Sequence, residues 1–376
     1  MIFFYILLFF ISIIFLSFSF SGYGSLTNLR TKNNFFLDLF LGLIIVSFLI
    51  TLIHFFFKIN LLISFLIFLL GSFIFFKKKG LKILDFFKVK NIKYLIIIFL
   101  LIPMYLSQKY HEDFGYYHLP YALAFLEEKI IFGFANINPS YVYNSIWLNL
   151  NSIFFLNGKN FNFLTLSSFI LYLSFIIFSL HNIFSQKNTK VSDYYLITLL
   201  FYFLLKFTRI SEFGVDFPSV IFSVLGIYYF IKFYETSLEI EKKTFFYLNS
   251  IFSIFAVLIK LSVIPVIFLP IFLYIKNFQI LRFYILNLKF SFIYFFVLIF
   301  FLQQFIYTGC FFFPSELTCF NVSWFNNDYL ILSEKLELIN KSYSVARDIY
   351  SPSEYLSNFT WFTFWLNRNY TEILEH

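Results

Sequence analysis

The residues best suited to chemistry lie in a short acidic and aromatic segment that directly follows an apolar run. Asp113 is its central carboxylate, and Glu112 precedes it. A carboxylate at the end of a membrane span is costly unless it is solvated, paired or used. Such a group can act as a general base on a hydroxyl or hold a divalent cation. The alternative is a solvated cap, with Tyr116, Tyr117 and Tyr121 in the interfacial aromatic belt.

A second acidic segment, RISEFGVDFPS, contains Arg209, Glu212 and Asp216. In a helix, Glu212 and Asp216 would share a face at i, i+4. Gly214 and Pro218 favour instead a turn that opens the next span, with the proline near its first turn. These acids are open to the same chemistry as those of the first segment; the alternative is a polar connector.

Lys260 interrupts the apolar stretch AVLIKLSVIP. A lysine in such a stretch must snorkel to the interface, pair with an acid or bind an anion. One interpretation is snorkelling alone, and the other is contact with the phosphate of a lipid. Arg209 is a second candidate for that phosphate, because a guanidinium can bind it through two parallel hydrogen bonds.

The composition shows that lipid, not water, surrounds most of the chain. Of the 376 residues, 60% are hydrophobic and 13% are charged, with a mean hydropathy of +0.81; a soluble domain carries about 25% charged residues. The net charge of +8 does not indicate nucleic acid, because seven of the 28 basic residues fall in the short loop 77–93. Such loops set membrane orientation.

Apolar runs predict an all-α, polytopic transmembrane helical bundle of about 10–11 membrane segments. A full crossing needs about 17–25 residues, so the shortest runs extend into their flanks or are half-helices. Alternating strand patterns are absent, which argues against a barrel. The runs are 1–20, 35–57, 59–76, 94–107, 144–157, 163–184, 194–207, 217–233, 245–258, 262–275 and 290–308.

The distribution of lysine and arginine predicts which loops face the cytoplasm. One topology fits if 144–157 does not cross fully and if 245–275 is a hairpin that turns near Lys260. It places both acidic segments on the outer face, where they can share one aqueous cavity. The cytoplasmic loops are then 77–93, 185–193, 232–244 and 276–289, and the outer ones 108–162, 208–216 and 309–376.

These spans divide into three segments. Residues 1–93 hold the first spans and the basic loop, 94–308 form the membrane core with the outer acidic loops, and 309–376 form a polar outer segment. Since the last segment ends without a closing span, we expect a fragment or an unusually short member of its class. Cys310 and Cys319 lie there, and an oxidising outer compartment favours a disulfide between them over two unrelated thiols.

The segments EDFGYYHLPY, SEFGVDFP and IKLSVIP, in this order along the chain, resemble the GT-C type membrane glycosyltransferases. That class includes protein O-mannosyltransferases and lipopolysaccharide-modifying transferases. The similarity is closest to uncharacterised bacterial multispan proteins, which share the segment GCFFFPSELTCF. It covers roughly 94–325. The first three spans and the early end depart from the family pattern.

The resemblance implies transfer of a sugar from a polyprenyl-phosphate donor to a cell-envelope glycan or lipid acceptor, in a bacterial inner membrane. Asp113 would be the base or metal-associated acid, with Glu112 as second choice. Asp216 would be the second acid, a divalent cation is an open possibility, and no nucleic acid is involved. The residues that would contact substrate are Arg209, Glu212, Lys260, His118 and Tyr117.

Other functions remain open. A transporter or flippase of lipid-linked glycans would be expected to show internal repeats and charges near mid-membrane, and the sequence shows neither. A glycan polymerase or ligase would be expected to use outer-loop arginines, whereas the last loop is net acidic. A structural or assembly subunit is the third alternative. The sequence contains no P-loop, GxGxxG, HExxH or serine nucleophile elbow, so an ATP-driven or dinucleotide-dependent enzyme is not supported.

Overall fold

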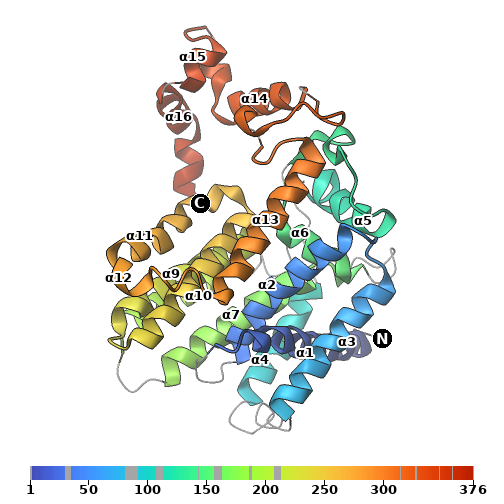
Figure 1. Ribbon diagram of the computed structural model, residues 1–376, viewed down its shortest axis with the longest axis vertical. Helices are drawn as coiled ribbons and strands as arrows, with labels where there is room; N and C mark the ends of the chain where they lie inside the picture. Colours follow the sequence, from blue (N-terminus) through green and yellow to red (C-terminus); the bar gives the residue numbers. More distant parts are fainter. Residues whose placement is uncertain are drawn as a thin grey trace. The chain divides into compact units, whose positions relative to one another are not determined.

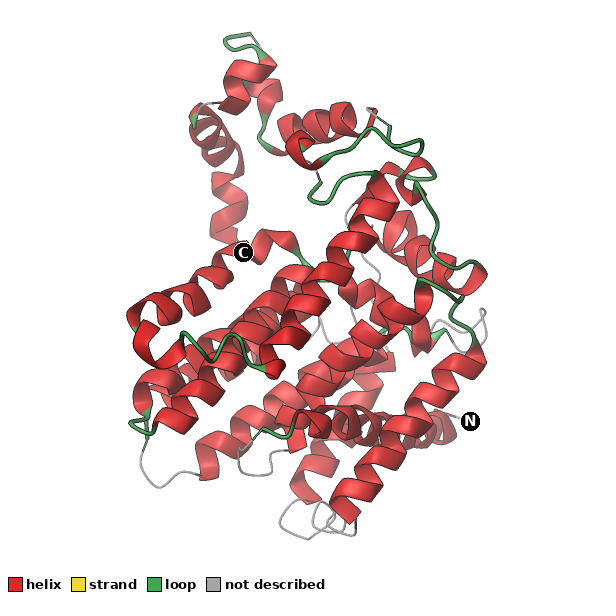
Figure 2. Cartoon of the chain, in the orientation of Figure 1, coloured by secondary structure: helices red, strands yellow, loops and turns green. Residues whose placement is uncertain are grey.

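The computed structural model is helical throughout its described residues, with helices and loops but no strand (Figure 2). The all-α fold class is therefore confirmed. The described residues are 2–29, 35–80, 92–106, 113–142, 144–155, 163–185, 189–206, 213–313, 315–326, 328–346, 348–357 and 359–375.

Seven of the described helices are long and apolar enough to cross a bilayer. They have 19 to 23 residues each. At about 1.5 Å per residue they match a hydrocarbon layer of about 30 Å. The chain is thus an integral, multi-pass membrane protein. The seven are α1 (Ile2–Gly24), α2 (Phe35–His54), α3 (Leu61–Lys79), α7 (Leu166–Ser185), α9 (Asp216–Glu235), α10 (Glu239–Ile259) and α13 (Leu288–Thr308).

Shorter helices fill the intervals. They are α4 (Ile92–Leu106), α5 (Leu119–Glu127), α6 (Ile146–Asn151), α8 (Val191–Leu205), α11 (Phe268–Lys276), α12 (Phe278–Leu281), α14 (Asp328–Asn340), α15 (Pro352–Ser357) and α16 (Thr360–Glu375).

The chain forms two compact units. The first comprises residues 1–130 and 144–300, and the second comprises 131–143 and 301–376. Helix α13 begins in the first unit and ends in the second.

Within the first unit, α1 packs on both α2 and α3 (Figure 1) through glycines that let the backbones approach closely. A Cβ added at Gly42 would lie 1.7 Å from the carbonyl oxygen of Phe20. One added at Gly22 would lie 1.9 Å from the carbonyl oxygen of Gly71. Membrane helices associate by such close packing, because lipid gives apolar side chains no reason to prefer one another.

Helices α9 and α10 form an antiparallel pair across the short connection at 236–238 (Figure 1). The buried Asn249 donates its amide hydrogen to the carbonyl oxygen of Gly226 at 2.8 Å. Phe222 and Phe255 meet edge to face beside it, with ring centroids 4.7 Å apart. One polar contact in an apolar seam fixes the register of the two helices.

The described residues agree with the two conditions of the predicted topology. Within 144–155, the run holds the six-residue helix α6 and the 3₁₀ turn Ser152–Phe154, together about 15 Å long, which is too short to cross a bilayer. All six residues of α6 are buried in protein, as a half-helix in a membrane requires. The run 245–275 breaks at Lys260, where the backbone is extended between α10 and a 3₁₀ turn that leads into α11.

The second unit is built around a disulfide between Cys310 and Cys319. Ala135 packs against Cys310. The Gly133 amide donates to the Ile306 carbonyl oxygen at 2.9 Å, and Asn136 donates to the carbonyl oxygen of Trp324 at 3.0 Å. The segment that leaves the first unit at residue 130 is therefore held by residues far along the chain.

Candidate functional site

The two acidic segments meet within the first unit. Residues Phe114–His118 form a π-helical turn directly before α5. Phe114 packs edge to face on Phe213 of the second segment, with ring centroids 5.2 Å apart. His118 is 4% exposed, and its Cε1 atom lies 3.8 Å from where a Cβ on Gly214 would stand. The His118 ring therefore lies against the backbone two residues before Asp216, at a distance that a methyl group on Gly214 would also tolerate.

Asp216 is the first residue of α9, where the helix dipole favours a carboxylate. Its position follows from the local sequence. Gly214 and Val215 form the bend that enters the helix, and Pro218 occupies the first turn, where a missing backbone N–H costs no intrahelical bond. The turn interpretation of this segment, with the proline in the first turn of the next span, is confirmed.

Asp216 pairs with Lys260. The Nζ atom of Lys260 lies 2.5 Å from Oδ1 of Asp216. The carboxyl side chain keeps 58% of its surface exposed, and the lysine side chain 39%. Both charged groups are therefore accessible to solvent and to a substrate, and an exposed pair of this kind adds little to stability.

A buried polar cluster connects Tyr121, which follows the first acidic segment, to the residue before Lys260. The Tyr121 hydroxyl donates at 2.8 Å to Oδ1 of Asn144 and lies 2.9 Å from Oδ1 of Asn149. The hydroxyl of Ser145, the residue after Asn144, donates to the carbonyl oxygen of Ile259 at 2.8 Å. Asn144 and Ser145 thus join α5 to the last residue of α10, immediately before Lys260.

Sequence reasoning missed Asn144 and Ser145 as supports of the site. The available signal was the polar content of YNSIWLNLN, which is unusual for a membrane run. Asn149 also donates to the Thr51 hydroxyl at 3.0 Å, and so ties α6 to α2. Buried side chains of this kind are stable in a membrane only when they bond one another.

The structure describes five of the eight predicted catalytic and substrate-binding residues. It places His118 and the backbone of the Asp216 segment side by side and pairs Asp216 with Lys260. Asp113 directly precedes the π-helical turn, and Tyr117 lies within it, with its ring centroid 4.2 Å from that of His118. Glu112, Arg209 and Glu212 lie outside the described residues.

A cation site stays a prediction. Within the described ranges, no group of three or more His, Cys, Asp or Glu side chains could hold a metal ion. A site built from Asp113 alone would draw its other ligands from the substrate, as magnesium sites that bind phosphates do.

Fold and site together define a helical, multi-pass membrane protein. Its accessible ion pair joins Asp216, at the start of α9, to Lys260, directly after α10. The chain belongs to the family described as Domain of unknown function (DUF8201), which matches residues 1–375. No curated protein and no solved structure matches the chain.

Proposed function

We propose that the protein is a GT-C type glycosyltransferase of the bacterial inner membrane, which moves a sugar from a polyprenyl-phosphate donor to a cell-envelope glycan or lipid acceptor. The observation that carries the proposal is the meeting of the 113–118 and 213–216 segments next to the exposed Asp216–Lys260 pair. An acceptor hydroxyl and a phosphate leaving group need one acid and one cation within a single accessible site.

In this reaction the bond between the sugar anomeric carbon and the phosphate oxygen breaks, and a bond from that carbon to the acceptor oxygen forms. Asp113 takes the hydroxyl proton, with Glu112 as the alternative, and Asp216 is the second acid. Lys260 and Arg209 hold the polyprenyl phosphate that leaves as an anion. A general base contributes about 10²–10⁴ in rate. His118 and Tyr117 line the site.

The main alternative is a transporter or flippase of lipid-linked glycans. A transporter site would be expected near mid-membrane, between repeated halves. The Asp216–Lys260 pair lies instead where α9 begins and α10 ends, which favours the enzyme. A glycan polymerase or ligase would use a donor of the same class, so only the product of the reaction distinguishes it from the proposed transferase.

The test uses the full chain in nanodiscs with polyprenyl-phosphate donors that carry a radiolabelled sugar. Extracted envelope lipids serve as acceptors, and water serves as the minimal acceptor. We expect release of polyprenyl phosphate, and a loss of about 10²-fold or more in Asp113→Asn and in Asp216→Asn. Release at the wild-type rate in both variants would refute the assignment of these carboxylates, and donor movement across the bilayer without release would support the flippase.

The matched control is the Glu239–Lys243 pair. Its Nζ to Oε1 distance is also 2.5 Å, and its side chains are 58% and 34% exposed. Glu239→Gln removes a carboxylate of the same exposure from a pair of the same geometry, but at the other end of α10. We expect full transfer in this variant. A loss as large as that of Asp216→Asn would show that the assay reports general damage.

A further inference from the structure

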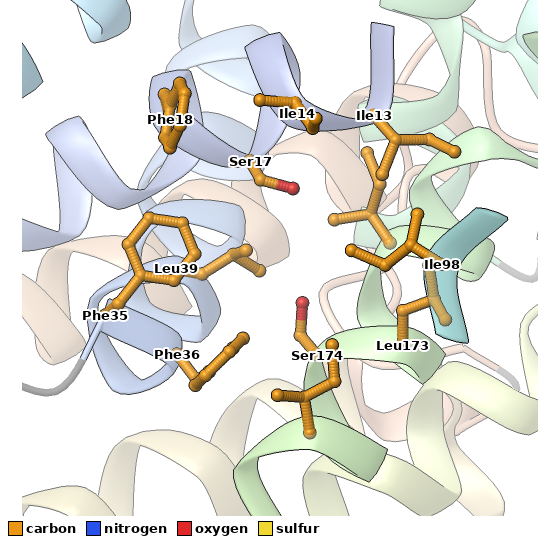
Figure 3. Close-up of a pocket in the computed structure, with 12 residues that line it drawn as sticks. Ile13, Ile14, Ser17, Phe18, Phe35, Phe36, Leu39, Ile98, Leu173 and Ser174 are labelled. Atoms are coloured by element: carbon orange, nitrogen blue, oxygen red, sulfur yellow. The ribbon is translucent and has the colours of Figure 1, made fainter. Parts of the chain in front are cut away.

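The apolar space between α1, α2, α4 and α7 is too small to hold a lipid. It is lined by apolar side chains together with the hydroxyls of Ser17 and Ser174, and it has room for about one water molecule (Figure 3). An acyl chain does not fit there, so lipid contacts these helices from outside the bundle.

On the outside of the first unit, one connection between helices is basic and contains no acid. Residues 276–289, the basic connection, join α11 to α13 and include the short helix α12. They contain Lys276, Arg282 and Lys289, and the sequence has no aspartate or glutamate anywhere between Glu241 and Glu316. A segment of this charge is complementary to anionic phospholipids.

The basic connection is folded against the bundle. Leu281 is fully buried. The ring of Phe290, directly after the connection, stacks on Phe246 of α10 with centroids 5.4 Å apart. The Tyr294 hydroxyl of α13 donates to the carbonyl oxygen of Ile285 at 3.1 Å. The outer side chains of the connection are therefore held at the ends of the helices it joins.

Large apolar side chains form much of the outer surface of the basic connection. Phe283 is 71% exposed, Leu286 is 75% exposed and Leu288 is 85% exposed. Leu288 is the first residue of α13, which is long enough to span the bilayer. These side chains thus stand where a membrane helix begins, at the boundary between hydrocarbon and water.

The apolar surface continues onto both helices that the basic connection joins. Phe272 and Ile275 are exposed on α11, and Tyr294 and Leu298 are exposed on α13. Exposed apolar side chains of a membrane bundle face hydrocarbon. A basic and apolar segment next to such a surface places its apolar side chains among acyl chains and its charged groups among phosphates.

The connection between α9 and α10 differs in charge. Because α11 packs back on α9 and α10, and α12 packs on α10, both connections lie at the same end of these helices (Figure 1). Residues 232–244, the neighbouring connection, contain three basic residues and three acids. The acids have partners of their own, which are Lys232 for Glu235, Lys243 for Glu239 and Thr236 for Glu241.

We propose that the basic connection is a binding surface for anionic phospholipid at the membrane interface. Phe283, Leu286 and Leu288 enter the acyl layer, and the three basic side chains bind lipid phosphates. Arg282 lies over the ring of Phe283, with its Cζ atom 4.6 Å from the centroid, so a phosphate ligand and an apolar anchor are adjacent. Positive charge that only sets orientation needs no exposed apolar side chains beside it.

This surface is separate from the proposed transfer site. Lys260 directly follows α10, whereas the basic connection packs near the start of that helix. The 21 residues of α10 extend over about 30 Å. The inference therefore stands whether or not the protein transfers sugars.

The first experiment measures lipid binding to the full, delipidated chain by native mass spectrometry. Phosphatidylglycerol and phosphatidylcholine with the same acyl chains are titrated separately. We expect tighter binding of phosphatidylglycerol. Lys276→Gln and Arg282→Gln should each weaken that binding about fivefold, since a basic residue near the membrane surface contributes about 1 kcal/mol.

The matched control is Lys243→Gln. It removes the same charge at the same end of α10, but from the neighbouring connection, where Lys243 is paired with Glu239. We expect unchanged phosphatidylglycerol binding in this variant. Equal affinity for the two phospholipids, or a loss in Lys243→Gln as large as that in Lys276→Gln and Arg282→Gln, would overturn a specific surface for anionic lipid.

The second experiment tests whether the apolar side chains reach the acyl layer. The photoreactive residue p-benzoylphenylalanine replaces Leu286 in the full chain, which is irradiated in phosphatidylglycerol nanodiscs. We expect covalent lipid adducts, as at Leu298 on the exposed side of α13, which serves as the positive control. Lipid adducts at Leu298 but none at Leu286 would overturn the proposal. Adducts between Leu286 and a second copy of the chain would show a protein interface instead.

Discussion

The disulfide of the second unit gives a quantitative prediction. Cys310 and Cys319 are nine positions apart, and the bond closes a loop whose amides are paired across it. The Phe311 amide donates to the Thr318 carbonyl oxygen at 3.1 Å, and the Phe320 amide donates to that of Gly309 at 3.0 Å. Opening this loop frees the chain between the cysteines, and the cross-link limits how many conformations the open state can reach.

The chain-entropy relation gives the size of the effect. For a separation of nine, the lost entropy corresponds to about 2.6 kcal/mol at 25 °C, which is a factor of about 80 in the opening equilibrium. Reduction of the bond should therefore speed exchange of the Phe311 and Phe320 amides by up to about 80-fold. Hydrogen exchange with mass spectrometry on peptides within 301–326 measures this directly.

Two perturbations separate the cross-link from side-chain effects. Reduction of the wild-type protein changes no residue, and the Cys310→Ser/Cys319→Ser double variant removes the thiols. The control is Leu317→Ser, because Leu317 is 98% exposed within the same loop. A change of less than about threefold on reduction would refute the entropic account, and a comparable change in the control would show that the loop responds to any substitution.

Three further outcomes follow from the first unit. Breaking the Asp216–Lys260 pair should cost under about 1 kcal/mol in a double-mutant cycle of thermal unfolding, because both groups are exposed; a coupling above about 2 kcal/mol would mark a buried structural pair. Gly42→Ala should destabilise by about 3 kcal/mol or more, because its Cβ would overlap a backbone oxygen, whereas Gly115→Ala, with open space around it, should have little effect on stability in the same melting assay. Ser145→Ala should cost about 1 kcal/mol in stability and reduce transfer, with Ser145→Thr restoring both if the hydroxyl is the acting group.

Most of the fold follows from the length of the apolar runs. A run of about 20 residues in lipid must be helical, because the bilayer offers its backbone no other partner. The same reasoning, with positive charge placed on one side, required two conditions: that 144–157 does not cross fully, and that 245–275 turns back near Lys260. In the described residues, 144–155 hold only short helical turns, and the chain breaks at Lys260 so that α11 packs on α10.

The contacts of the site were only partly predictable. The meeting of the two acidic segments follows from their placement on one side of the bilayer. The partner of Lys260 does not, because a lysine at the end of a span can bind a carboxylate or a phosphate equally well. The pairing with Asp216 joins residues 44 positions apart, and no local periodicity encodes such a separation. The same holds for the hydrogen bond from Ser145 to Ile259.

Residues 131–143 belong to the second unit, and this has a consequence for the biosynthesis of the chain. Asn136 bonds to Trp324, 188 positions later in the chain. A ribosome adds about 5–20 residues per second, so roughly 10–40 s pass before the partner segment exists. Phe134 and Ala135 are both buried in the finished protein. During that interval the C-terminal residues that bury them have not yet been synthesised. A chaperone or the insertion machinery has a defined time window, and a defined apolar target, in which to protect the nascent chain.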